Sequence, residues 1–181
     1  MPALFAYGTL TSTEVMCALT GANVAASAIP AILPNHRRVK LKNRSYPTVV
    51  ETSGAEVVGM VFPDLDSFAW RTIDAYEGVE YLLTDCTVRT LTGKFLKVRV
   101  FMLREELSHL ILDEEWDFDG WQEHNLAKAV SDCVEFREEV EAVRKRELMR
   151  GLGEAKFNEE TMLMIAGEDD PQLDVEAAIR G

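Results

Sequence analysis

Cysteine is scarce in this sequence of 181 residues, and the three that occur, Cys17, Cys86 and Cys133, lie far apart with no CxxC pair. Their odd number and wide spacing argue against a disulfide framework or a zinc site and favour free thiols in a reducing compartment. The N-terminus lacks the basic segment of a signal peptide, and the most apolar stretch, residues 22–33, is too short to cross a bilayer. We therefore expect a cytoplasmic protein without a membrane partner.

Metal-binding patterns are also lacking. The three histidines, His36, His109 and His124, have no metal-ligand spacing. Alternating acidic residues between Asp113 and Asp119 resemble a calcium loop, but Leu126 occupies the twelfth position, where a bidentate glutamate is needed. The sequence thus predicts neither a metal nor another cofactor.

Positive charge is too sparse for a nucleic-acid-binding protein. The net charge is −12, and the excess is confined to residues 104–181, which hold 22 acidic and nine basic residues. Residues 1–103 hold nine acidic and ten basic ones, with basic residues alternating along one segment at positions Arg38, Lys40, Lys42 and Arg44. This period of two predicts the solvated face of an edge strand, and the alternative is a surface that attracts an anionic substrate. Because only Tyr46 lies near these cations, we expect no nucleic-acid partner.

The N-terminus combines an apolar strand, a glycine and a helix start within a dozen residues. Residues 4–7 are apolar or aromatic, Gly8 follows, and Thr11-Ser12-Thr13-Glu14 forms a capping-box pattern for a helix that ends at Gly21. Backbone N–H groups and the positive end of the helix dipole should converge here, which favours binding of a carboxylate. The alternative is an ordinary strand-to-helix turn. The N–H groups in question belong to Gly8, Thr9 and Leu10.

A second notable stretch is Asp74-Ala75-Tyr76-Glu77-Gly78, followed by Tyr81. It ends a predicted helix that begins at Asp64 or Asp66. Glu77 would lie in the last turn, where the helix dipole, the like charge of Asp74 and partial burial all raise the pKa of a carboxyl group. A carboxyl group that titrates near neutrality can both accept and return a proton. The alternative is a surface glutamate.

Together the two stretches resemble the γ-glutamylcyclotransferase-like family, which includes the plant AIG2-like proteins. The resemblance spans about Ala3 to Leu103 and depends on the order and spacing of several short motifs. These motifs are Tyr7-Gly8-Thr9-Leu10, Leu33-Pro34, Tyr46-Pro47, Val58-Gly59 and the stretch ending at Glu77-Gly78. One departure concerns substrate choice: many relatives carry an arginine shortly after the tyrosine matching Tyr81, whereas Leu82, Leu83 and Thr84 follow here.

The pattern of elements and the resemblance both imply an α+β fold, with a curled mixed β-sheet or small β-barrel and flanking helices, over residues 1–112. The strands 57–62, 84–90 and 96–103 are predicted from their apolar and β-branched residues, and residues 22–33 are predicted to be a linker. Residues 113–181 should form an acidic helical extension packed on this domain.

The extension is predicted to be helical from Arg104 onward. Its main helix would begin at a capping box on Asp119 and end at Gly151, with shorter helices at 158–166 and 171–180. Three aromatic residues precede or begin this helix and would anchor it to the domain or wall a substrate pocket, namely Trp116, Phe118 and Trp121. A homodimer through this helix is a further expectation.

The resemblance implies an enzyme that cyclises a γ-glutamyl group to 5-oxoproline and releases an amine or amino acid. Glu77 would be the general acid and base. The substrate-binding residues implied are Tyr7, Gly8, Thr9, Leu10, Tyr46, Pro47 and Tyr81. A dipeptide, glutathione and a γ-glutamylamine all stay open as substrates. The alternative function is a catalytically inactive module on the same fold that binds a small metabolite or another protein.

Overall fold

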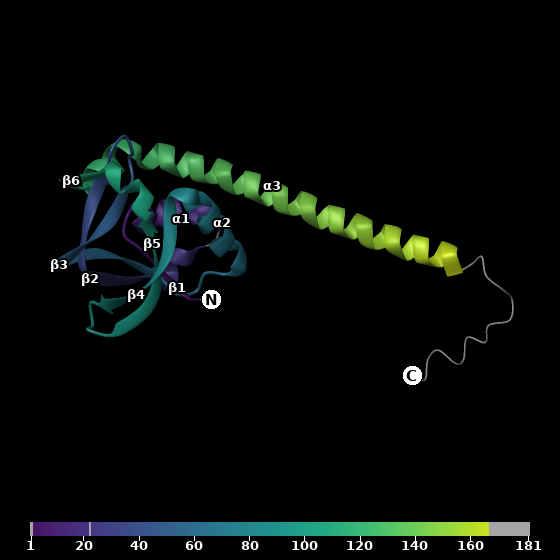
Figure 1. The fold of residues 1–181 in the computed structure, drawn as a ribbon, viewed down its shortest axis with the longest axis horizontal. Coiled ribbons are helices and arrows are strands. Elements are labelled where there is room, and N and C mark those ends of the chain that lie inside the picture. The colour runs from purple at the N-terminus through teal and green to yellow at the C-terminus, as the bar shows by residue number, and fades with distance from the viewer. Residues whose placement is uncertain (1, 22, 167–181) are drawn as a thin grey trace. The chain divides into compact units, whose positions relative to one another are not determined.

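The computed structural model describes residues 2–21 and 23–166 of the chain (Figure 1). A first compact unit ends at Val140, and the remaining residues form a second one. The strands are β1 (Ala3–Ala6), β2 (Ile29–Leu41), β3 (Pro47–Phe62), β4 (Tyr81–Thr90), β5 (Phe95–Leu103) and β6 (Ile111–Glu115). The helices are α1 (Thr13–Thr20), α2 (Ser67–Glu77) and α3 (Phe118–Ala166), with short 3-10 segments at Thr9–Thr11, Val24–Ser27, Gly78–Glu80 and Glu105–Leu110.

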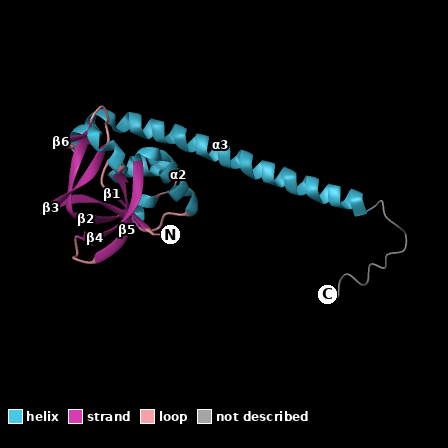
Figure 2. Ribbon diagram, in the orientation of Figure 1, coloured by secondary structure: helices cyan, strands magenta, loops and turns pink. Residues whose placement is uncertain are grey.

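Strands β1 to β5 form a closed barrel. They are hydrogen-bonded in the order β3-β1-β5-β4-β2, and β2 pairs again with β3, which closes the ring. The sheet is mixed because β1 runs parallel to β5 and antiparallel to β3. Figure 2 shows the strands together in one body, accompanied by helices α1 and α2. The prediction of a small barrel with flanking helices and a C-terminal helix is therefore confirmed.

Strand β1 lies at the centre of the hydrophobic core. Phe5 and Tyr7 belong to the cluster inside the barrel, whereas Leu4 and Ala6 belong to a second cluster shared with α1 and α2. This alternation follows from the two-residue period of a strand. The backbones of β1 and β3 are so close at Gly59 that a Cβ atom there would overlap the Ala6 carbonyl oxygen and the Phe5 ring. Only glycine fits at this position.

Two predicted regions need correction. The linker expected over residues 22–33 is wrong from Ile29 onward, since β2 begins there despite Pro30. Proline is tolerated at the start of a strand and at a bulge, and Pro34 directly precedes such a bulge at Asn35, where the register between β2 and β3 shifts. The helix expected from Arg104 onward is wrong at residues 111–115, which form β6.

Strand β6 is acidic and pairs with the basic part of β2. Arg37 forms an ion pair with Asp113, and Lys40 Nζ lies 2.9 Å from Glu114 Oε2. Lys40, one of the alternating cations, therefore pairs with β6 and does not simply face solvent. The partners of Arg37 and Lys40 come from a segment more than 70 residues away, so local sequence patterns could not identify the strand.

The first part of α3 belongs to the first compact unit. Asp117, rather than the predicted Asp119, caps its start, because Asp117 Oδ1 accepts a hydrogen bond from the Asp119 N–H at 3.1 Å. Trp116 and Trp121 are buried, and the Trp116 indole N–H donates to the Ser45 carbonyl at 3.0 Å. Further along, Arg137 donates to the Ala18 carbonyl at the end of α1.

Helix α3 does not end at Gly151 but continues to Ala166, so the separate helix expected at 158–166 is wrong. An interior glycine costs a helix only about 1 kcal/mol relative to alanine. No proline occurs between Gly151 and Ala166 to end the helix. The helix expected at 171–180 lies outside the described residues. Within residues 2–21 and 23–166, no helix is both long and apolar enough to cross a membrane.

Truncation tests how much of α3 the barrel needs. A chain ending at Arg104 loses Trp116, Trp121 and Cys133 from the core, so it should aggregate or lose cooperative unfolding. A chain ending at Val140 keeps these residues and should unfold cooperatively in urea, as measured by tryptophan fluorescence. A soluble, cooperatively folding fragment of residues 1–104 would contradict this prediction.

Candidate active site

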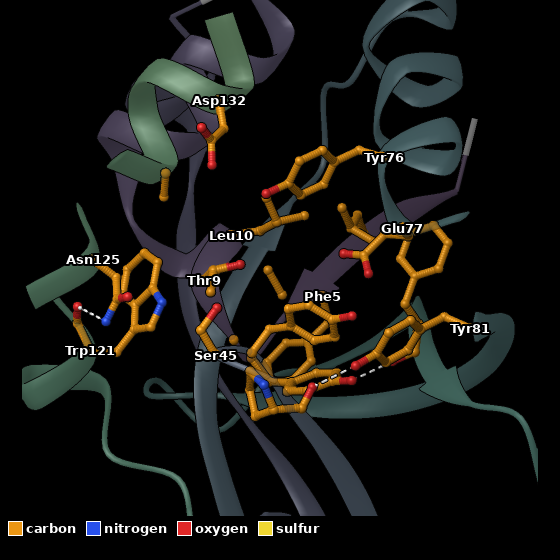
Figure 3. A pocket seen from close by; sticks show the side chains of 18 of the residues that line it. Phe5, Thr9, Leu10, Ser45, Tyr76, Glu77, Tyr81, Trp121, Asn125 and Asp132 are labelled. Atoms are coloured by element: carbon orange, nitrogen blue, oxygen red, sulfur yellow. Dashed lines mark hydrogen bonds between the residues drawn. The ribbon is translucent and has the colours of Figure 1, made fainter. Parts of the chain in front are cut away.

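A cavity of about 490 Å³ opens where β1, β3, α2 and the first part of α3 meet (Figure 3). Every residue that the sequence analysis assigned to a site lines this cavity. They are Tyr7, Gly8, Thr9, Leu10, Tyr46, Pro47, Glu77 and Tyr81. The structure thus brings together four segments that are up to 74 positions apart in the sequence.

The loop after β1 forms part of the cavity wall. Gly8 leads into the 3-10 segment Thr9–Thr11, and both the N–H and the hydroxyl of Thr11 donate to the Gly8 carbonyl, at 3.0 and 2.6 Å. Within the described residues, the N–H groups of Gly8, Thr9 and Leu10 donate to no acceptor. Three free N–H groups in one turn are suited to bind a carboxylate.

Helix α1 starts one residue later than the capping-box pattern indicates. Ser12, not Thr11, is the N-cap, and its hydroxyl accepts from the Val15 N–H at 3.3 Å. Glu14 receives a hydrogen bond from the Ser12 hydroxyl at 2.9 Å instead of closing a box. The dipole of α1 therefore begins beyond the 3-10 segment, and Thr11 is free to brace Gly8.

Hydrogen bonds hold the loop in place from several directions. The Arg38 guanidinium donates to the Tyr7 carbonyl at 2.8 Å and lies 5.2 Å from the centre of the Trp116 ring. The Tyr7 hydroxyl donates to the Phe101 carbonyl on β5 at 2.7 Å. A Cβ atom on Gly8 would lie only 2.9 Å from Pro47 Cγ, so a larger residue would displace the loop.

The wall opposite the loop is built mainly of tyrosines. The Tyr81 hydroxyl donates to the Pro47 carbonyl at 2.8 Å, and the Tyr46 hydroxyl donates to Glu80 at 2.8 Å. Glu80 also pairs with Arg44, which holds Tyr46 over Tyr81 with ring centres 6.3 Å apart. These contacts fix the start of β3 against the end of α2.

Glu77 is the last residue of α2, and its carboxylate points into the cavity (Figure 3). Asp66 caps the start of the helix, and Gly78 ends it with a φ of 65° that favours glycine. Burial raises the pKa of Glu77 from the ordinary 4.5 to about 7. Asp74 is exposed on the same helix, so burial rather than its like charge accounts for the shift.

The neighbouring hydroxyls keep their protons. Burial raises the pKa of Tyr7, Tyr76 and Tyr81, and the negative charge of Glu77 raises each of them further. Near neutral pH, Glu77 is consequently the group in this wall that exchanges a proton. The described residues contain no cluster of three or more side chains arranged to hold a metal ion.

One face of α3 also lines the cavity. From this face, only the aromatic residue Trp121 was predicted to wall a pocket. Of the three proposed aromatics, Trp121 lines the cavity, whereas Trp116 and Phe118 line a separate groove beside Arg38. The polar residues were missed, although their three- and four-residue spacing is typical of one helix face. They are Asn125, Lys128 and Asp132.

The closed barrel thus carries a cavity that is lined by the loop after β1 and by the buried carboxyl group of Glu77. The family model described as "Gamma-glutamyl cyclotransferase, AIG2-like" matches residues 4–118, which is more than half of the chain. The chain belongs to this family.

Curated relatives agree with this assignment. The chain is 30% identical to AIG2-like protein C of Arabidopsis thaliana over 75% of this chain and 77% of that protein. It is 25% identical to AIG2-like protein B of the same plant, over 93% of this chain and 90% of that one. A solution structure of an Arabidopsis thaliana protein has the same fold, with a TM-score of 0.56 and 23% identity over 79% of this chain and 84% of that one.

The raised pKa of Glu77 makes stability depend on pH. Because the folded protein disfavours the charged carboxylate, the contribution of Glu77 to stability is most favourable below pH 4.5, becomes less favourable as the pH rises towards 7, and then levels off. A shift of this size corresponds to about 3 kcal/mol. Glu77→Gln cannot ionise, so it should unfold at about the wild-type urea concentration at pH 4.5 and at a clearly higher one at pH 8.

Asp74→Asn is the matched control for this measurement, because it removes a carboxylate from the exposed face of the same helix. If Glu77→Gln differs from the wild type by the same amount at both pH values, the pKa of Glu77 is not raised in the folded protein.

Proposed function

We propose that the protein is a γ-glutamylcyclotransferase, which converts a γ-glutamyl amide into 5-oxoproline and a free amine. The observation that carries the proposal is the placement of Glu77, with a pKa of about 7, in the same cavity as the free N–H groups after β1. A γ-glutamyl compound carries an α-carboxylate, an α-ammonium group and a side-chain amide, and this cavity can accommodate each of them.

In this proposal the N–H groups of Gly8, Thr9 and Leu10 bind the α-carboxylate. Glu77 removes a proton from the α-ammonium group, and the resulting amine attacks the γ-carbonyl carbon of the same molecule. A C–N bond forms and closes a five-membered ring. The tetrahedral intermediate then expels the departing amine, which takes the proton from Glu77 as the original amide bond breaks. The ionised Glu77 removes the second proton from the ring nitrogen and passes it to the released amine, which leaves the neutral lactam.

The reaction is intramolecular, so correct positioning of the substrate supplies much of the rate. The rigid wall of Tyr7, Tyr46 and Tyr81 supports this role, because its hydroxyl groups are already engaged in hydrogen bonds to the protein. Leu82 and Thr84, which follow Tyr81 where relatives carry an arginine, do not line the cavity. Since leucine and threonine are also uncharged, the segment after Tyr81 supplies no charged group to the substrate.

Glu77→Gln tests the catalytic role. Glutamine has nearly the same shape but cannot accept or return a proton, so kcat should fall by about 10²–10⁴ while the substrate still binds. Formation of 5-oxoproline from a panel of γ-glutamyl compounds measures kcat, and calorimetric titration measures binding. Asp74→Asn again serves as the control.

Two outcomes would contradict the proposal in different ways. Turnover by Glu77→Gln within threefold of the wild type would remove Glu77 from the mechanism. Binding without turnover by the wild-type protein across the whole panel would instead support the inactive module.

The rate should also depend on the ionisation of Glu77. Since the ionised carboxylate is the base, kcat/KM should rise with pH through an apparent pKa of about 7, well above the ordinary value of 4.5. The profile should be measured with substrates whose amines have different pKa values, because the substrate ammonium group also titrates. An acidic limb near pH 4 for every substrate would refute the raised pKa.

A further inference from the structure

Lys128 is the only cation among the described residues that line the cavity. It lies on α3 with Trp121, Asn125 and Asp132, which Figure 3 shows across the cavity from Glu77 and Tyr81. The other charged residues of the lining are Glu77 and Asp132, both acidic. An anionic ligand that reaches the α3 face therefore has Lys128 as its one charged partner.

The present partner of Lys128 is easily replaced. Lys128 Nζ lies 2.8 and 2.5 Å from the two carboxylate oxygens of Asp132, one helical turn later. The Lys128 side chain is 77% exposed and that of Asp132 is 52% exposed. Exposed ion pairs at this spacing contribute only a few tenths of a kcal/mol, so a ligand carboxylate can compete with Asp132.

The proposed reaction leaves one part of the substrate for this face of α3. The α-carboxylate is assigned to the loop after β1, and the α-ammonium group and the scissile amide are assigned to Glu77. What extends beyond them is the departing amine with its substituents. Its surroundings would be the Trp121 ring, the Asn125 amide and the Lys128–Asp132 pair.

Building on the proposed function, we propose that Lys128 selects γ-glutamyl compounds whose departing amine carries a carboxylate. Lys128 binds that carboxylate by exchanging it for Asp132, and Asp132 opposes binding by competing for Lys128. Lys128 is thus a specificity residue, and amides of simple uncharged amines should be poorer ligands.

Two compounds test this directly, γ-glutamyl-alanine and γ-glutamyl-ethylamine, which differ only by the carboxylate of the departing group. Their dissociation constants are measured by calorimetric titration on Glu77→Gln, where turnover does not interfere. The carboxylate should tighten binding about twofold, as expected for one exposed ion pair. Adding Lys128→Glu should abolish or reverse this preference, whereas adding Asp132→Asn should increase it.

Lys97→Glu is the matched control, because it changes the net charge equally at an exposed position on β5 outside the cavity. It should leave the preference unchanged. Urea unfolding of each variant shows whether the fold is intact. Both side chains of the Lys128–Asp132 pair are largely exposed, so neither substitution should alter the unfolding midpoint appreciably.

Several outcomes would overturn the inference. Equal weakening of both compounds by Lys128→Glu would assign Lys128 to the glutamyl carboxylate, and an unchanged preference would remove it from the site. Failure of both compounds to bind would contradict the inference and the proposed binding site together. If the preference behaves as expected but the wild type forms no 5-oxoproline, the Lys128 assignment stands and the catalytic proposal fails.

Discussion

The close contact between β1 and Gly59 of β3 is the constraint on which both the barrel and the cavity depend. It allows Phe5 and Tyr7 to fill the barrel while Leu4 and Ala6 pack against the helices. Because β1 is held on both sides by β3 and β5, the chain leaves it at one defined place. Gly8 then passes beside Pro47, and Gly8, Thr9 and Leu10 line the cavity.

The packing around the cavity also buries the carboxyl group of Glu77. Tyr76 and Tyr81 flank it in the sequence and, with Tyr7, surround the cavity, and burial there lifts the pKa of the carboxyl group to about 7. At neutral pH the buried, ionised Glu77 lowers the stability of the protein. Groups with such a perturbed pKa are common at functional sites. The hydroxyl groups of Tyr7 and Tyr81 donate to backbone carbonyls, and that of Tyr46 donates to Glu80. Under the proposed function, Glu77 is therefore the group that transfers the proton.

Local sequence patterns sufficed for the parts of the structure that depend on local chemistry. Gly8, Gly21 and Gly78 mark chain reversals or helix ends, Asp66 caps α2, and the hairpin between β4 and β5 turns at Gly93. The elements that were missed depend on distant partners. β6 is a strand because acidic residues meet the basic part of β2, and the start of β2 is a strand because the barrel closes through it.

The candidate site shows the same division. On its barrel side, eight lining residues were named from the sequence through motifs that resemble those of the family, whereas Ser45, Tyr76 and Phe101 were not. The polar residues of the α3 side were missed, because Asn125, Lys128 and Asp132 form an ordinary polar helix face until the fold sets that face against the cavity. The family match ends at residue 118, before all three. If Lys128 selects the departing group, the chemistry belongs to the shared barrel and the selectivity to the helix that follows it. Substitutions on this face of α3 could then change the substrate without disturbing Glu77.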